Sequence, residues 1–203
     1  LMYAVFALGF VIIYKTSLVL NLAQGEIIYL LAMIGYELTS ELGAPIWLAL
    51  PGILLISVLL GFSINWLVIR PLLEQPIVAT IMVTIALGLI LRGIVTGNWQ
   101  RTVYFFPAFF GIQPITLFKI MIPRSQLFVL ALCGVVIFLL ALFVTRTKQG
   151  LGMRASGEDM QTARSLGINA KVIVAITWAI ACAMGGIGAF AVGTVTGISA
   201  GIP

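Results

Sequence analysis

Three polar side chains interrupt the apolar N-terminal part of the sequence. Asn21, Gln24 and Glu26 stand within the short stretch 21–26, together with the flexible Gly25. Where a helix breaks inside a membrane, its freed backbone groups and nearby amides can bind a polar solute, and an intramembrane carboxylate is costly and usually functional. Two interpretations stay open. The stretch is an ordinary interfacial turn, or it is a broken or re-entrant segment whose residues Asn21, Gln24, Gly25 and Glu26 line a substrate path.

Lys15 precedes this stretch and is the nearest basic residue on its N-terminal side. It is either a snorkelling residue at the end of a span or an ion-pair partner of Glu26.

A second polar stretch, 150–169, combines signals for the start and end of a short helix. Ser156 followed by Asp159 is an S-x-x-D start signature, and Glu158 and Asp159 suit the positive helix end. Gly167 suits a left-handed C-terminal residue, so the pattern predicts a helix over about 157–166. Its small apolar face carries Met160, Ala163, Leu166 and Gly167. This helix is either a solvated connector on the membrane surface or a docking helix for a groove on a soluble partner.

Several chemistries are excluded by composition. Histidine is absent, so a His-containing zinc site or a Ser-His-Asp triad cannot be assembled within this chain. The two cysteines, Cys133 and Cys182, lie inside apolar runs and are typical of small buried hydrophobes. No basic cluster is interleaved with aromatic residues. We therefore expect no enzyme activity, no metal site and no nucleic-acid partner.

The elements that carry these residues belong to a membrane protein. Of the 203 residues, 62% are hydrophobic and 8% are charged, whereas soluble domains carry about 25% charged residues. A soluble core cannot bury this much apolar surface. We expect an all-α, polytopic helical bundle in a lipid bilayer. About six spans are predicted, at about 1–20, 27–43, 46–69, 76–97, 125–145 and 172–196.

The distribution of basic residues predicts the orientation of this single transmembrane domain, 1–203. The loop 146–171 holds the strongest basic cluster and is predicted to be cytoplasmic, which places the proline- and aromatic-rich loop 98–124 outside. The sequence starts at Leu1 without a signal peptide and stops at Pro203 directly after an apolar segment. We expect a fragment of a longer subunit.

Small residues recur every four positions along the last predicted span. This stripe predicts close helix packing, and comprises Ala181, Gly185, Ala189, Gly193, Gly197 and Gly201.

Three segments resemble one family of membrane proteins. Tyr14-Lys15-Thr16-Ser17 with 21–26 resembles its Y-[RK]-T-S…N-F-A-[HQ]-G-E stretch, 70–72 its R-P-L loop, and 150–169 its G-x-x-x-R-A-x-x-E-D…A…L-G-I-N coupling segment. The chain is similar, over essentially its whole length, to the LivH-type permeases of branched-chain amino acid ABC importers.

This resemblance implies a bacterial or archaeal inner-membrane subunit that imports branched-chain or related small amino acids. The implied partners are a second homologous permease, two cytoplasmic ATPases that bind ATP and Mg, and an extracytoplasmic solute-binding protein. This chain itself would hold no cofactor, in agreement with the absence of a G-x-x-x-x-G-K-[ST] motif. The residues implied to couple to an ATPase are Ser156, Glu158, Asp159, Ala163 and Gly167.

Departures from the family pattern leave alternatives open. Leu22 and Gln24 replace the commoner Phe and His, which removes any proton-linked role of that His, and Gly157 replaces Ala, which weakens the docking helix. One alternative is a stand-alone secondary transporter of urea, an amide or an amino acid, with Glu26 and Lys15 as an ion or proton site. Another is a structural membrane subunit that transports nothing.

Overall fold

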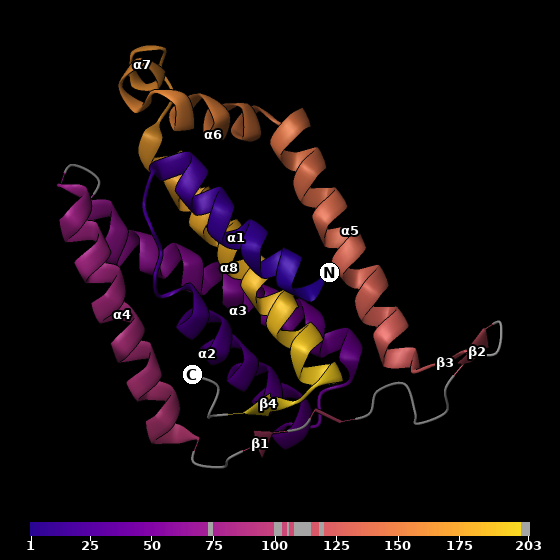
Figure 1. Cartoon of the computed structure of the whole chain (residues 1–203). Helices are drawn as coiled ribbons and strands as arrows, with labels where there is room; N and C mark the ends of the chain where they lie inside the picture. The colour runs from indigo at the N-terminus through magenta and orange to yellow at the C-terminus, as the bar shows by residue number, and fades with distance from the viewer. Residues whose placement is uncertain (73–74, 100–102, 105, 108–114, 118–119, 200–203) are drawn as a thin grey trace.

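The computed structural model describes residues 1–72, 75–99, 103–104, 106–107, 115–117 and 120–199, and these are mainly helical (Figure 1). The α-helices are α1 (Met2–Ser17), α2 (Gln24–Tyr36), α3 (Ile46–Ile64), α4 (Ile77–Asn98), α5 (Arg124–Arg146), α6 (Lys148–Glu158), α7 (Met160–Ser165) and α8 (Ala170–Val195). Two π-helical turns, η1 (Glu37–Glu41) and η2 (Asn65–Ile69), and a 3-10 turn, η3 (Arg70–Leu72), extend α2 and α3. The predicted all-α class is confirmed.

Short strands lie at one end of the bundle. β1 (Val103–Tyr104) pairs antiparallel with β4 (Ile198–Ser199), and β2 (Ile115–Leu117) pairs antiparallel with β3 (Ile120–Ile122). Helices α6 and α7 lie at the opposite end (Figure 1). The parts of the predicted loops 98–124 and 146–171 that the structure describes are therefore at opposite ends of the molecule; positions 100–102, 105, 108–114 and 118–119 lie outside the described residues.

Four helical segments are long and apolar enough to cross a membrane, within the described part of the chain. They are Ile46–Leu72, Ile77–Asn98, Arg124–Arg146 and Ala170–Val195, and they make this a multi-pass membrane protein. They match the last four predicted spans. The first predicted span corresponds to α1, whose 16 residues are fewer than the roughly 20 that a span needs. The second corresponds to the 13 residues of α2 with the 5 of η1, and this segment carries Glu26, Glu37 and Glu41. The count of six spans stays a prediction.

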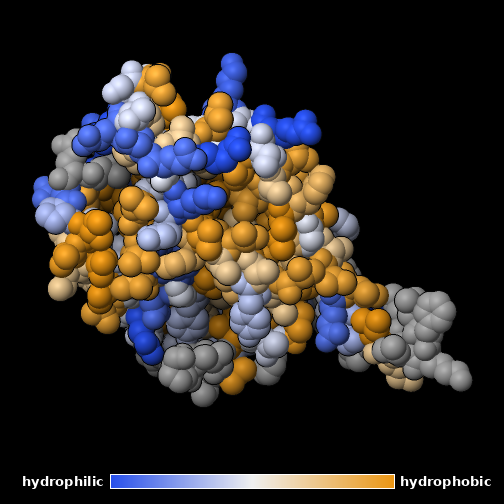
Figure 2. Space-filling view, turned by 45° about the horizontal axis from the view of Figure 1, so that its top comes forward, coloured by the Kyte–Doolittle hydropathy of each residue, from blue (hydrophilic) through white to orange (hydrophobic). Residues whose placement is uncertain are grey.

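Helix α8 is the centre of the bundle, and α1, α2 and α3 pack around it. In the most apolar window of α8, 72% of the residues are buried, against 11% for α5 at the edge. Trp178 and Phe190 on α8 are fully buried. The broad hydrophobic band on the outside of the bundle is visible in Figure 2, below the hydrophilic end that carries α6 and α7.

Small residues allow the close approach of α3 and α8. A Cβ at Gly61 of α3 would lie 2.6 Å from the carbonyl oxygen of Trp178, so only glycine fits at this separation. On α8, Gly193 packs against the ring of Phe106. Gly197 has φ +73° and lies beyond the end of α8 at Val195, in the turn before β4. The stripe of small residues on the helix thus ends at Gly193, and Gly201 lies outside the described residues.

Candidate functional site

The link between α1 and α2 is an interruption of six residues. Helix α1 ends at Ser17 because Leu18 adopts a left-handed conformation with φ 54°, and the N–H of Leu18 donates to the carbonyl oxygen of Tyr14 at 2.8 Å. Residues 18–23 are not helical, and α2 begins at Gln24. Gln24, Gly25 and Glu26 therefore form the first turn of α2, three residues earlier than the predicted start of this span.

The interruption lies beside the middle of α4. The Thr84 hydroxyl donates to the carbonyl oxygen of Leu20 at 3.1 Å, and a Cβ at Gly88 would lie 3.5 Å from the Cα of Ala23. Thr84 and Gly88 are central residues of this 22-residue helix. Figure 1 accordingly shows α2 starting about halfway along the bundle rather than at one end. Polar residues of the interruption are thereby brought among the apolar helices.

Asn21 and Gln24 form a buried amide pair at this position. Their side chains are 1% and 7% exposed, and Asn21 Nδ2 donates to Gln24 Oε1 at 2.8 Å. Asn21 Oδ1 and Gln24 Nε2 are buried without a hydrogen-bond partner among the described residues. Rotating both amides by 180° exchanges the roles of the atoms but still leaves one donor and one acceptor unpaired. Because an unpaired buried polar atom costs about 1–3 kcal/mol, this pair is suited to a ligand with both kinds of group.

The Gln24 amide lies close to Gly9 of α1 and Gly185 of α8. A Cβ at Gly9 of α1 would lie 3.3 Å from Gln24 Nε2, and one at Gly185 of α8 would lie 3.8 Å from the same atom and 3.3 Å from Ile28 Cγ1. Gly185, singled out for helix packing, thus lies against α2 and the amide pair. Gly9 gave no signal in the sequence, because its role depends on the packing of helices far apart in the chain.

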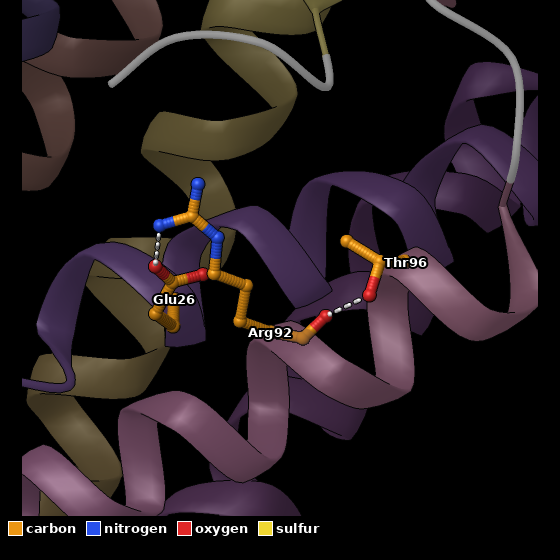
Figure 3. A network of polar contacts seen from close by, with 3 residues as sticks. All are labelled: Glu26, Arg92 and Thr96. Atoms are coloured by element: carbon orange, nitrogen blue, oxygen red, sulfur yellow. Dashed lines mark hydrogen bonds and ion pairs between the residues drawn. The ribbon is translucent and has the colours of Figure 1, made fainter.

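Glu26 lies two residues after Gln24 in the first turn of α2 and forms an ion pair with Arg92 of α4. Its Oε1 is 3.7 Å from Arg92 Nη1, with the two side chains 26% and 56% exposed. Figure 3 shows Arg92 reaching across from α4 to Glu26, while the Thr96 hydroxyl donates to the Arg92 carbonyl oxygen at 3.0 Å. The ion-pair partner of Glu26 is therefore Arg92 and not Lys15. Sequence reasoning missed Arg92, because no local pattern connects it to Glu26.

The polar stretch 150–169 forms two helices instead of the predicted single one. Thr147 caps α6, its hydroxyl accepting from the Gly150 N–H at 3.0 Å. This helix continues through Ser156, so the predicted start at Ser156 is wrong. Asp159 is the N-cap of α7 instead, accepting from the N–H groups of Gln161 and Thr162 at 2.8 and 3.1 Å.

The hydroxyl of Thr162 also donates to Asp159 Oδ2, at 2.5 Å. This hydrogen bond, followed by those from the backbone of Thr162 and Gln161, lowers the pKa of the Asp159 carboxyl below 3.8. The cap is therefore charged at neutral pH and stabilises the start of α7.

Gly167 ends α7 as predicted. Its φ is +85°, its N–H donates to the Arg164 carbonyl at 3.0 Å, and the Ile168 N–H donates to the Ala163 carbonyl at 3.1 Å. These two bonds form a Schellman motif. The predicted left-handed residue is confirmed.

The five residues assigned to ATPase coupling divide into two sets. Glu158, Asp159 and Gly167 are exposed at the end of the bundle. Ser156 and Ala163 are 4% and 2% exposed, so they pack inside and do not form part of an outer contact face. The buried Ser156 Oγ has no hydrogen-bond partner among the described residues.

Gly157 connects this segment to α1. Its backbone packs directly against the carbonyl oxygen of Lys15, where a Cβ would overlap with that oxygen. The sequence indicated only that Gly157 weakens a helix; the close approach depends on tertiary packing. Helix α6 also packs on α5 and α8, so it contacts three helices of the bundle.

Comparisons with known proteins identify similar sequences over nearly the whole chain. The family model described as branched-chain amino acid transport system, permease component, matches residues 1–201. The high-affinity branched-chain amino acid transport system permease protein BraD of Pseudomonas aeruginosa is 24% identical over 97% of this chain and 68% of its own length. LivH of Escherichia coli K12 has the same identity and coverage. The probable LivH of Methanocaldococcus jannaschii is 27% identical over 89% of this chain and 59% of its own length. No solved structure gives a significant match.

Proposed function

From the premise that this chain belongs to the branched-chain amino acid transport permease family, we propose that it forms part of the membrane path of an ATP-driven importer. The solute is a branched-chain amino acid or a related small amino acid. The membrane is the inner membrane of a bacterium or archaeon. This chain contributes the path, and separate ATPase subunits bind ATP and Mg.

The observation that carries this proposal is the Asn21–Gln24 pair. Both amides are buried at an interruption beside the middle of α4, and together they keep one unpaired donor and one unpaired acceptor. A zwitterionic amino acid offers a carboxylate to a donor and an ammonium group to an acceptor. The apolar helices around the pair suit an aliphatic side chain. In this proposal α1 and α2 are short membrane segments on either side of a break, as in discontinuous transporter helices.

Three exposed residues at the ends of α6 and α7 support the assignment of a docking surface for an ATPase. Glu158, Asp159 and Gly167 lie at the end of the bundle that carries the basic loop. Through Gly157, α6 contacts the last turn of α1, which leads into the interruption. A rigid-body displacement of α6 by an ATPase therefore reaches α1 directly. The remaining partners in this proposal are a second permease subunit and, at the opposite face, a solute-binding protein.

The experiment is uptake of radiolabelled leucine by proteoliposomes. The full-length subunit is reconstituted with its co-purifying ATPases and second permease, with binding protein added outside and ATP or a non-hydrolysable analogue inside. We expect leucine uptake with ATP only. Gly167→Trp should abolish co-purification of the ATPases, whereas Leu151→Trp, at an exposed position of α6, should not. Uptake that continues without ATP on a proton gradient would instead support a secondary transporter. Intact assembly without uptake of any small amino acid would support a structural subunit.

A further inference from the structure

A groove at the α6–α7 end of the bundle lies outside the proposed solute path. It has a volume of about 500 Å³ and runs between the end of α3 with η2 and η3 and the start of α8. Its walls combine apolar residues, among them Phe62, Val172 and Ile176, with Asn65, Arg70 and Lys171. Phe62 and Val172 are about half exposed, at 43% and 50%, on the outer surface of helices long enough to span a membrane.

The described residues that line the groove carry charge of one sign. Arg70 and Lys171 are exposed, and none of these described lining residues is Asp or Glu. Two cations at the end of an apolar wall are complementary to a ligand that has an anionic group joined to a hydrocarbon chain. Trp66 also lines the groove and is 65% exposed; tryptophan is typical of the level of the lipid headgroups.

Asn65 provides a second, independent observation. This residue lines the groove and is 4% exposed, and its Nδ2 has no hydrogen-bond partner among the described residues. A buried amide without a partner is costly in an apolar bundle. A phosphate oxygen beside the two cations would accept from it.

We propose that this groove binds an anionic phospholipid. Arg70 and Lys171 neutralise the phosphate, Asn65 donates to it, and an acyl chain lies along Phe62, Val172 and Ile176. The position favours a lipid over a protein partner, because the apolar wall is part of the exposed surface of helices long enough and apolar enough to cross a membrane. This site is independent of which solute the chain transports.

The experiment measures lipid binding to the full-length subunit by native mass spectrometry after removal of lipid in a neutral detergent. The probes are dioleoyl phosphatidylglycerol and dioleoyl phosphatidylcholine. Since each basic residue near an anionic lipid surface strengthens binding about fivefold, we expect Lys171→Gln to weaken phosphatidylglycerol binding about fivefold. Arg70→Gln/Lys171→Gln should weaken it about 25-fold. Asn65→Leu, which keeps the volume, should weaken binding of both lipids, because both carry the phosphate that accepts from Asn65. The charge variants should weaken phosphatidylglycerol binding more than phosphatidylcholine binding, since only phosphatidylglycerol carries a net negative charge.

Arg146→Gln is the matched control, since Arg146 is the last residue of α5, at the same end of the bundle, and does not line the groove. Equal unfolding temperatures in neutral detergent show that the variants are folded. The proposal is overturned if the double variant keeps its preference for phosphatidylglycerol or if Arg146→Gln abolishes it. It is also overturned if free glycerol 3-phosphate competes for the groove as well as phosphatidylglycerol does. A double variant that still binds phosphatidylglycerol but no longer co-purifies with the ATPase would also overturn it, since Arg70 and Lys171 would then contact a protein.

Discussion

Gly157 near the end of α6 packs against the carbonyl oxygen of Lys15 in the last turn of α1. The contact leaves no room for a Cβ at position 157. Lys15 precedes the left-handed Leu18, at which the interruption leading to Asn21 begins. One backbone contact thus joins the helix pair at the end of the bundle to the segment that carries the buried amides.

Replacing Gly157 by Ala tests this contact. Although Ala raises helix propensity, its Cβ would overlap with the Lys15 carbonyl, and we expect a loss of about 1–3 kcal/mol in the free energy of unfolding. The measurement is unfolding in mixed micelles. Gly134→Ala in α5 is the control, because nothing lies within 4 Å of a Cβ there. Equal stabilities of the two variants would contradict the close contact.

Replacing Gly167 by Ala tests the effect of its left-handed backbone conformation on stability, because the new Cβ makes no steric contact. A Cβ meets nothing within 4 Å at either Gly167 or Gly25, but Gly167 has φ +85° whereas Gly25 is in the first turn of α2. We expect Gly167→Ala to lower stability by about 1–2 kcal/mol, the cost of a left-handed non-glycine residue. Gly25→Ala should be neutral or stabilising by up to about 1 kcal/mol. The Schellman assignment fails if both substitutions have the same effect.

Features encoded by local sequence were predicted correctly. The spans that became α3, α4, α5 and α8 are uninterrupted apolar runs long enough to cross a bilayer, and the left-handed Gly167 follows from the end of a short amphipathic pattern. The start of α7 was misplaced because Ser156 and Asp159 are both good caps. Thr147 is the N-cap of α6, and α6 continues through Ser156. Asp159 is therefore the N-cap of α7.

Features that depend on packing between distant segments could not be predicted. The stretch 21–26 was recognised as unusual, but its burial depends on where Thr84 and Gly88 of α4 lie. Arg92 as the partner of Glu26, and Gly9 beside Gln24, likewise require the positions of separate helices. Local polarity therefore indicated which residues matter, and tertiary structure determined which of them meet.

Asp159 should titrate at unusually low pH. Because hydrogen bonds from Thr162 and Gln161 lower its pKa in the folded protein, its stabilising effect on α7 is fully present above the ordinary carboxyl pKa of 3.8. It is lost as the pH falls through the lowered value. Carbon-13 NMR of the labelled carboxyl should show this pKa, and Thr162→Val should raise it. Thr145→Val, which removes a hydroxyl bonded within α5, should leave it unchanged. A pKa insensitive to Thr162→Val would contradict the cap geometry.

The Glu26–Arg92 ion pair predicts a specific order of stabilities. Glu26→Gln leaves Arg92 without its partner across the 3.7 Å contact, so we expect it to be less stable than the double variant Glu26→Gln/Arg92→Gln. A double-mutant cycle measured by unfolding in micelles should give a coupling energy of about 0.2–1 kcal/mol, the range for solvent-exposed ion pairs. Additive effects of the two substitutions would show that the pair contributes nothing.

Gln24 separates the stability of the amide pair from its role in transport. Gln24→Leu breaks the 2.8 Å hydrogen bond and leaves Asn21 buried without it, so we expect a loss of about 1–3 kcal/mol. Replacing both residues, in Asn21→Leu/Gln24→Leu, removes both polar groups and should recover most of that stability.

Leucine uptake by the reconstituted importer should distinguish a role in stability from a role in solute binding. The variant Asn21→Leu/Gln24→Leu recovers stability but still lacks both amides. We expect uptake by both variants to fall about tenfold or more, as when a solute loses a hydrogen-bonding partner worth about 1.4 kcal/mol. Thr96→Val is the control, since its hydroxyl donates to the backbone of its own helix, α4, and to no other described residue. If the stable double variant transports leucine at the normal rate, Asn21 and Gln24 serve only to pack α2 between α1 and α8, and the solute path lies elsewhere in the bundle.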